Sequence, residues 1–316
     1  PGLNGANPLG FLAALGLFRH VATQRDAEAR LSWGISDGVW SPVIWSHDLL
    51  SDDPDSVLDW LVDSLAVEPE SHWLYQLSLF SDERLGLARP SAYSLASQEA
   101  TIHERSTADW LSCNGSDLCD ASSNNQLQTA RRDYFPRSAI AIVKAMTREH
   151  LERSLFRQWD YGDPIKEVSL HLEPREDRRH AYQWHKPMGD PTRALHGGMV
   201  GANRLAMEAW PLFQSLPQRG ELQTVGFRGT RPMSGIRWTW PIWSVPVTFD
   251  SVTPMLNLRD LHDDSPDSAT SSQRLRARGI AAAFRLQRIL VEKTPNFTAP
   301  VALFTTRQLS PPEAAV

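Results

Sequence analysis

The chain has 316 residues, 41% hydrophobic residues, 22% charged residues and a formal net charge of −5. This balance is typical of a soluble globular protein with one large core or two ordinary ones. The negative net charge gives the molecule no overall field that attracts polyanions, which disfavours an autonomous DNA-binding protein. We also expect a cytoplasmic location, because the first apolar segment is too short to span a membrane and has no basic leader typical of a signal peptide.

An apolar helix is predicted to begin at Pro8. Asn7 can cap its first turn, and proline is favoured at the first helical position because the missing N–H is not needed there. Gly10 and Gly16 are poor helix residues. Their presence predicts that another part of the backbone packs closely against this helix.

A hairpin and a second helix are predicted to follow. Residues 30–33 and 39–45 have strand composition, and a turn with glycines at both ends, residues 34–38, separates them. Asp53, Pro54 and an acidic first turn then begin an amphipathic helix that reaches Leu65.

The next part of the chain gives weaker signals. Residues 72–80 fit either a helix or a strand. From Pro90 to Thr129 the sequence loses its periodicity and gathers serine, asparagine and aspartate, which predicts a poorly ordered loop.

The second half is predicted to contain the longest helix, from Ser138 to about Trp159, and a half-buried strand over residues 168–172. A long polar segment begins at Glu173, and a loop of that length is either functional or mobile. A further helix is expected at residues 201–210, where Gly-Ala-Asn repeats the opening of the chain and Asn203 would be the cap.

The last third alternates between strand and helix signals. Strands are expected at residues 222–228 and 236–240, and the proline-containing run that follows must lie at a sheet edge or outside the sheet. A short helix is predicted over residues 249–258, and an acidic linker is predicted over residues 260–272. Residues 274–291 fit both a helix and a strand.

These elements predict an α+β fold of mixed helices with short antiparallel sheets and irregular loops. We expect an N-terminal α+β region over residues 1–130 and a C-terminal α+β region over residues 131–316. The two regions can also form one continuous domain.

Signals for catalysis are weak. The pairs His47-Asp48 and His262-Asp263 resemble the dipeptide of metal phosphohydrolases, but ten histidines among many aspartates produce such pairs by chance. The best metal candidate is a group in one polar loop, namely His180, His185, Asp190 and His196, whose spacings match no common site.

No phosphate-binding loop, dinucleotide-binding glycine motif or nucleophile elbow is present. Cys113 and Cys119 match neither a zinc clip nor a redox pair. We therefore predict that the chain is not an enzyme and needs no cofactor. The alternative is a metal-dependent nucleotide or nucleic-acid hydrolase that uses residues 180–196.

Arginines interleaved with aromatic rings are the more informative signal, because cations can bind phosphates while rings stack on bases. Only four of the 32 basic residues are lysine, a bias that a GC-rich genome also produces. The alternative is that these arginines form ion pairs with acidic residues on the protein surface. The predicted nucleic-acid-binding residues are Arg131, Arg132, Arg137, Arg175, Arg178, Arg179, Arg228 and Arg231. The predicted stacking rings are Tyr134, Phe135, Tyr182 and Trp184.

Several blocks of the sequence resemble a known protein family. The opening N-P-L-G-F-L-A-A-L-G-L-F-R from Asn7 is similar to the start of large-subunit and accessory proteins of type I CRISPR systems, particularly the I-G (formerly I-U) group. Later blocks resemble proteins encoded beside such systems. They are E-P-R-E-D-R-R-H-A-Y-Q-W (from Glu173), G-A-N-R-L-A-M-E-A-W-P-L-F (from Gly201), T-V-G-F-R (from Thr224) and W-P-I-W-S-V-P (from Trp240).

The resemblance implies a non-catalytic subunit of an antiviral, RNA-guided DNA-binding effector complex, in which base pairing reads the sequence while protein contacts the backbone and a short flanking motif. Its partners would be other CRISPR effector subunits, guide RNA and target DNA, with no membrane involved. Large subunits are usually longer than this chain. A second alternative is an adaptor that docks a helicase-nuclease through a tryptophan-rich surface.

Overall fold

The computed structural model describes residues 2–48, 53–79, 94–95, 97–98, 101–113, 125–129, 135–163, 168–173, 197–218, 221–229, 235–263, 268–291 and 294–305. The helices of this part are α1 (Pro8–Gln24), α2 (Pro54–Leu65), α3 (Trp73–Leu79), α5 (Ile102–Ser112), α6 (Phe135–Ala145), α7 (Arg148–Phe156), α9 (Val200–Glu208), α10 (Val252–Leu256) and α11 (Ser268–Ala277). Short 3-10 helices are η1 (Pro69–Ser71), η4 (Trp210–Leu212), η6 (Phe249–Ser251) and η7 (Arg259–Leu261).

The strands are β1 (Arg30–Ser36), β2 (Val39–Trp45), β3 (Ser215–Gln218), β4 (Glu221–Thr224), β5 (Phe227–Arg228), β6 (Arg237–Trp243), β7 (Val247–Thr248), β8 (Ile280–Val291), β9 (Thr294–Phe297) and β10 (Val301–Thr305). They form a three-stranded sheet β2-β1-β7, a five-stranded sheet β10-β8-β6-β5 to which β9 adds on β8, and the hairpin β3-β4. Every pair is antiparallel. The predicted α+β fold is confirmed.

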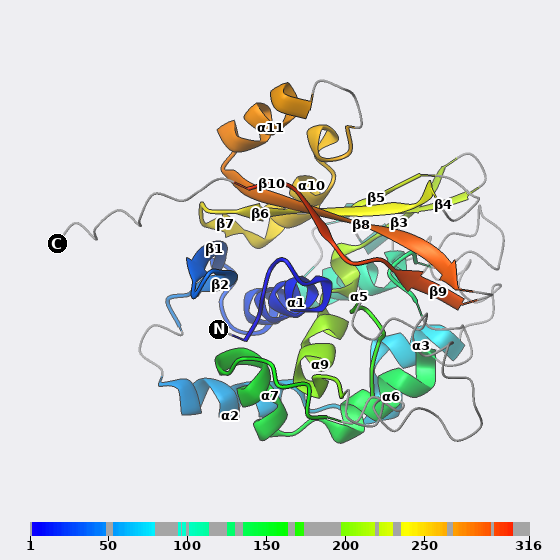
Figure 1. Ribbon diagram of the computed structural model, residues 1–316. Coiled ribbons are helices and arrows are strands. Elements are labelled where there is room, and N and C mark those ends of the chain that lie inside the picture. The colour runs from blue at the N-terminus through cyan, green and yellow to red at the C-terminus, as the bar shows by residue number, and fades with distance from the viewer. Residues whose placement is uncertain are drawn as a thin grey trace, which may run out of the picture.

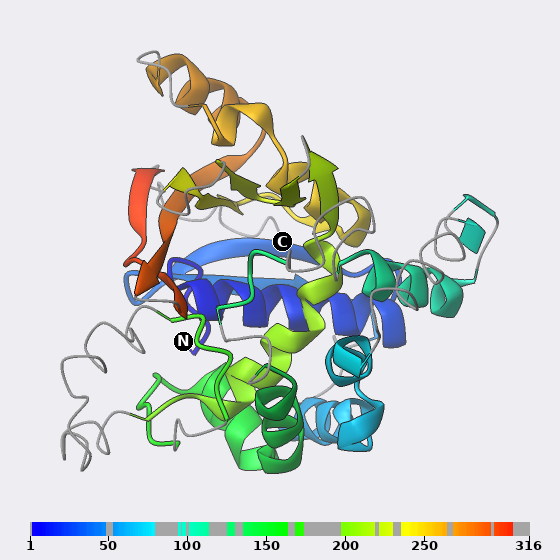
Figure 2. The same ribbon diagram turned by 90° about the vertical axis from the view of Figure 1, so that its right-hand side faces the viewer.

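Helix α1 lies between the sheets and a group of helices (Figure 1). The five-stranded sheet covers one side of it, and α9, α7, α2 and α6 lie on the other side; the view turned by 90° shows the same layers (Figure 2). Helices α10 and α11 lie beyond the sheet. One hydrophobic core runs through these layers and takes residues from both halves of the chain, from Leu3 to Phe297.

Aromatic rings fill the space between α1 and the sheets. The ring centroid of Phe11 lies 5.7 Å from that of Trp33 and 5.9 Å from that of Trp240. Two of the buried indole N–H groups have backbone acceptors: Trp240 donates to the Gly5 carbonyl (2.9 Å) and Trp243 donates to the Leu31 carbonyl (2.7 Å). Nε1 of Trp33 and of Trp238 is buried without a hydrogen-bond partner in the described structure, so ring packing rather than polar pairing accounts for the burial of these two side chains.

The backbones of α1 and α9 approach closely on the other side of α1. A Cβ atom at Gly16 would lie 1.8 Å from the carbonyl oxygen of Leu205, and a Cβ at Gly201 would lie 2.2 Å from the carbonyl oxygen of His150 on α7. A Cβ at Gly10 would lie 2.4 Å from the carbonyl oxygen of Asn4. The expected close packing at Gly10 and Gly16 is confirmed, and α9 is buried along its whole length.

The predictions made from local start signals are confirmed. Helix α1 begins at Pro8 with the Asn7 side chain accepting from the backbone N–H of Leu9 and Gly10, and α2 begins at Pro54 with Asp53 as its cap. The hairpin turns at Asp37 and Gly38, which both have positive φ. The turn is therefore shorter than the expected turn over residues 34–38, and residues 34–36 belong to strand β1. Residues 72–80 give helix α3, and 249–258 give η6 and α10.

Four predictions in the middle of the chain are wrong. The expected long helix is broken into α6 and α7 because Thr147 caps a new start, and the expected loop contains α5, which Thr101 caps in the same way. Residues 168–172 join no strand in the described ranges. Asn203 is no cap, because α9 begins at Val200; its side chain instead accepts from the Leu170 N–H and donates to the Met199 carbonyl.

The C-terminal predictions are partly confirmed. Residues 222–228 form β4 and β5, separated by a turn, and 236–240 lie within β6. The proline-containing run continues β6 at a sheet edge, because β5 pairs with Arg237 and Trp238 and leaves Pro241 without a neighbour on that side within the described chain. The expected linker is replaced by η7 and α11, and 274–291 is divided between α11 and β8.

The close approach of α1 and α9 gives a direct test. Helix propensity alone predicts that Gly16→Ala stabilises α1 by about 1 kcal/mol. We expect instead a loss of more than about 3 kcal/mol in the free energy of unfolding, because the new methyl group would overlap the Leu205 carbonyl. Urea unfolding measures the difference. Gly34→Ala is the control, since its Cβ would lie 4.0 Å from Val43 and should be nearly neutral; a G16A protein as stable as the wild type would contradict the packing.

Candidate functional site

Three of the predicted nucleic-acid-binding and stacking residues lie within the described ranges, and the structure gives them different surroundings. Arg137 is exposed on α6, and no ion pair within the described ranges involves it. Arg228 donates to the Phe227 carbonyl (2.6 Å) and to Asn257 (3.4 Å), and partial burial lowers its pKa. Gly229, which follows it, has a positive φ of 110°.

Phe135 does not lie where a stacking ring is expected. It is 7% exposed, and its ring centroid lies 5.4 Å from that of Trp210 in the core. The prediction that this ring stacks on bases is therefore corrected: in this structure it packs α6 against the segment after α9. Arg131, Arg132, Arg175, Arg178, Arg179, Arg231, Tyr134, Tyr182 and Trp184 lie outside the described residues.

The two largest predicted arginine clusters begin, in sequence, two residues after Thr129 and Glu173, which lie in segments that contact each other. Thr129 comes two residues before Arg131, and its hydroxyl donates to the backbone carbonyls of Leu170 and His171, both at 2.9 Å. Glu173 comes two residues before Arg175. Segments that are far apart in sequence are thus joined by hydrogen bonds just before each cluster begins.

Glu173 is itself held at the start of α1. The side chain is 1% exposed, and its carboxylate accepts from the Asn7 amide (2.5 Å) and from the Tyr161 hydroxyl (2.9 Å). Asn7 therefore caps α1 with its oxygen and binds Glu173 with its nitrogen. We call Asn7, Thr129, Tyr161, His171 and Glu173 the anchor cluster.

Two residues of the anchor cluster have strained backbones. Tyr161 and His171 both have φ of 54°, in the left-handed region that non-glycine residues seldom adopt. Such strain costs about 1–3 kcal/mol and persists where the surroundings fix the conformation. The contacts of the anchor cluster therefore hold the backbone at Tyr161 and His171 in these conformations.

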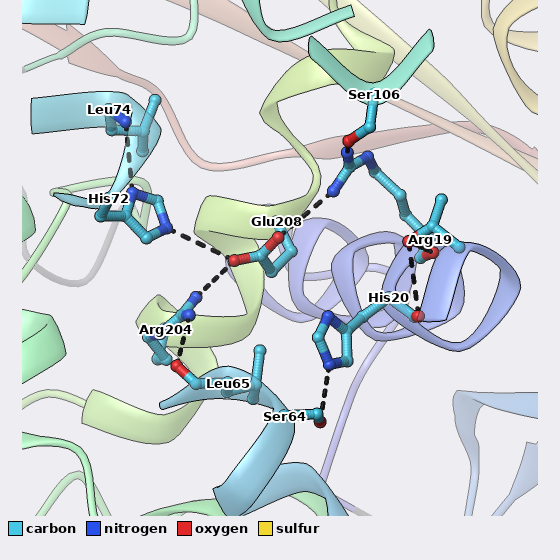
Figure 3. A network of polar contacts seen from close by, with 10 residues as sticks. Arg19, His20, Ser64, Leu65, His72, Leu74, Ser106, Arg204 and Glu208 are labelled. Carbon is cyan, nitrogen blue, oxygen red and sulfur yellow. Dashed lines mark hydrogen bonds and ion pairs between the residues drawn. The ribbon is translucent and has the colours of Figure 1, made fainter. Parts of the chain in front are cut away.

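A second group of polar residues is buried between α1, α5 and α9 (Figure 3). The Glu208 carboxylate accepts from Arg204 (2.7 Å), from Arg19 (3.2 Å) and from Nε2 of His72 (3.3 Å). Arg19 also donates to the Ser106 hydroxyl and Arg204 to the Leu65 carbonyl. The Arg19 guanidinium lies 5.3 Å from the centroid of the Trp110 ring.

These contacts determine the protonation states of Glu208 and His72. Burial alone would raise the pKa of Glu208, but the nearby Arg204, His72 and Arg19 outweigh it and hold that pKa well below its usual range. Burial lowers the pKa of His72, whose Nδ1 accepts from the Leu74 N–H, so the neutral ring donates through Nε2. His20, paired with the Ser64 hydroxyl at 2.8 Å, has its pKa lowered to about 4 by burial.

The Glu208 network is an internal connection between helices. Arg19 and Arg204 are 3% and 1% exposed, and both guanidinium groups point at one carboxylate. A buried ion pair of this kind is costly to break because the remaining partner stays charged in the interior. The network joins residues far apart in the chain, so composition and periodicity do not predict it. The Arg204–Glu208 spacing of four residues on one helix was the available signal.

No metal centre is found within the described ranges, which contain no group of three histidine, cysteine, aspartate or glutamate side chains placed to hold an ion. The loop proposed for a metal, with His180, His185, Asp190 and His196, lies outside them. His47 is exposed in a turn, and Nε2 of His262 bonds to the Leu256 carbonyl (3.1 Å). Burial raises the pKa of the Cys113 thiol, and Cys119 lies outside the described ranges.

An apolar cavity of about 320 Å³ opens on the side of α1 that faces α2. It is lined by residues of α1, β2, α2 and α7, chiefly Leu17, Val21, Pro42, Trp60, Leu155 and Phe156. Phe156 at α7 is 43% exposed. This cavity can accept an apolar side chain or ligand but holds no group suited to acid–base chemistry.

Comparison with known proteins gives no relative: neither the protein-family models nor the curated proteins match this chain. Among the described helices, none has both the length and the apolar character needed to cross a membrane.

The buried histidines predict a pH dependence of stability. In the unfolded chain His20 titrates near 6.5, whereas in the fold its pKa is about 4, so the unfolded state binds more protons between these values. The free energy of unfolding should fall by about 3 kcal/mol from this residue as pH drops from 6.5 to 4, and the lowered pKa of His72 acts in the same direction. Chemical unfolding at several pH values measures the slope.

His20→Gln is the matched variant, because glutamine can still bond to Ser64 but does not titrate. Its unfolding free energy should depend less on pH than that of the wild type. If the unfolding free energy changed equally with pH in both proteins, His20 would not be the source of the pH dependence.

Glu208→Gln tests the role of the network. Removing the charge leaves Arg19 and Arg204 buried beside a neutral group, and we expect a loss of about 3–5 kcal/mol of stability. Unfolding by urea gives the value. Glu70→Gln is the control, because Glu70 forms an exposed pair with Lys144 that should contribute about 0–1 kcal/mol. Equal effects of both substitutions would rule out a structural network.

Proposed function

We propose that this chain is a non-catalytic subunit of an RNA-guided, type I CRISPR effector complex in the cytoplasm, and that it binds the nucleic-acid backbone through its two larger arginine clusters. The observation that carries this proposal is the anchor cluster. Thr129 and Glu173 precede Arg131 and Arg175 by two residues each, and hydrogen bonds join their segments in the fold. In sequence, the two clusters therefore begin close to two chain segments that are hydrogen-bonded to each other, and together they hold six arginines and three aromatic rings besides Phe135.

Such an arrangement suits phosphate and base contacts. Each guanidinium can bind phosphate oxygens, and rings within the same segments can stack on unpaired bases. A net charge of −5 for the whole chain does not oppose this role, because backbone binding depends on local positive charge and partner subunits can supply the rest of the channel.

The sequence blocks that carry the family resemblance support a structural role. The block from Asn7 forms α1, the block from Gly201 lies in α9 and η4, and those from Thr224 and Trp240 lie in β4–β6. These elements pack on one another through Gly16 and the Phe11 and Trp240 rings. Their described residues thus serve packing, which favours a scaffold over an enzyme.

A second candidate is a docking adaptor for a helicase-nuclease. The apolar cavity beside α1 favours this role, because a partner can insert an apolar anchor between Trp60 and Phe156. An adaptor of this kind would bind its partner and have no affinity for RNA or DNA, which separates it from the first proposal.

Charge reversal tests the nucleic-acid role. We expect the triple variants R131E/R132E/R137E and R175E/R178E/R179E to bind single-stranded RNA or DNA at least about tenfold more weakly, and the slope of log affinity against log salt to fall by about two. Fluorescence anisotropy at several salt concentrations measures both. The variant R274E/R276E/R278E makes an equal change of charge in and directly after α11 and should have little effect on either quantity. Unchanged affinity and slope in both triple variants would reject the proposal.

A further inference from the structure

Strand β10 is an edge of the five-stranded sheet. It pairs with β8 through Val301, Ala302, Phe304 and Thr305, and no strand of the described chain pairs with its other side (Figure 1). A sheet edge presents unpaired N–H and C=O groups to which another extended chain can add. Whether another chain can add to β10 depends on the side chains of this strand.

β10 has few of the features that normally protect an edge. Natural edges carry lysine, proline or inward-pointing charge to prevent pairing. Residues 301–305 contain neither charge nor proline, and Val301 and Leu303 are 59% and 41% exposed. A register shift between Ala302 and Phe304 bends the strand but leaves these apolar side chains in solvent.

Helix α11 brings positive charge to the C-terminal end of this edge. The Arg276 guanidinium lies 5.6 Å from the centroid of the Phe304 ring. Arg274 and Arg278, with side chains 62% and 50% exposed, both pair with the carboxylate of Asp260 at 3.5 and 2.5 Å. Two guanidinium groups therefore share one carboxylate, and within the described chain Arg276 adds a third positive charge that remains for a ligand.

We propose that β10 is a docking edge for an extended segment of a partner protein, which adds to the sheet as a strand and carries carboxylates at the end that reaches Arg276. Backbone hydrogen bonds to β10 and contacts with Val301 and Leu303 would hold the strand, and the arginines of α11 would select its acidic end. The inference concerns a protein partner and does not depend on the nucleic-acid binding proposed above.

The charge also decides between a different protein and a second copy of this chain. Residues 300–310 contain no aspartate or glutamate. Pairing of β10 with β10 of a second copy would supply no carboxylate from this stretch to Arg276. An acidic strand from another protein is the better complement.

Labelled peptides test the proposal. The probe is a peptide of about seven alternating valine and threonine residues with three glutamates at one end, made in both orientations, and its counterpart carries three lysines. We expect an acidic peptide to bind by fluorescence anisotropy and to slow hydrogen exchange of the β10 amides. V301K/L303K should weaken its binding at least about tenfold, and R276A should weaken the acidic peptide more than the lysine peptide.

The control variant is L216K, because Leu216 is 58% exposed on β3 in a different sheet. It should bind the peptide like the wild type. The proposal is overturned if no acidic peptide binds at about 1 mM, if V301K/L303K and L216K behave alike, or if the wild-type protein forms a dimer that V301K/L303K abolishes. Affinity for RNA, measured on the same variants, should not change, which separates this inference from the proposed function.

Discussion

The close approach of α1 and α9 determines how the other helices and the buried charges of the core are arranged. Glycine at position 16 lets the Leu205 carbonyl lie where a side chain would otherwise be, and Gly201 does the same for α7. α9 is therefore enclosed, so its charged residues must find partners inside the protein. The Glu208 network satisfies that demand by taking cations from α1 and from α9 itself.

Helices α1 and α9 also contact the chain segments that precede the proposed binding segments in sequence. The N-cap of α1, Asn7, binds Glu173, and Asn203 of α9 binds the Leu170 backbone, which in turn meets Thr129. Each of these contacts holds the backbone in place at residues that precede an arginine-rich segment in sequence. The core thus holds in place the described residues that precede the two arginine-rich segments in sequence. Within the described ranges, the charges of the Glu208 network pair with one another.

Local signals allowed part of this fold to be predicted. Asn7 with Pro8, and Asp53 with Pro54, are neighbours in sequence, so caps and helix starts can be found without tertiary information. The break at Thr147 and the inward role of Asn203 depend on partners elsewhere in the fold. Arg19 and Glu208 are 189 positions apart, and no periodicity indicates that they meet. Phe135 was predicted as a stacking ring because sequence does not show its burial against Trp210.

Nucleic-acid binding by the two arginine-rich segments can be tested by ultraviolet crosslinking to single-stranded RNA or DNA, with the crosslinked peptides mapped by mass spectrometry. We expect crosslinks within residues 131–137 and 175–184, where the arginines alternate with Tyr134, Tyr182 and Trp184. Crosslinks confined to other elements, or none at all in these two segments, would contradict this binding.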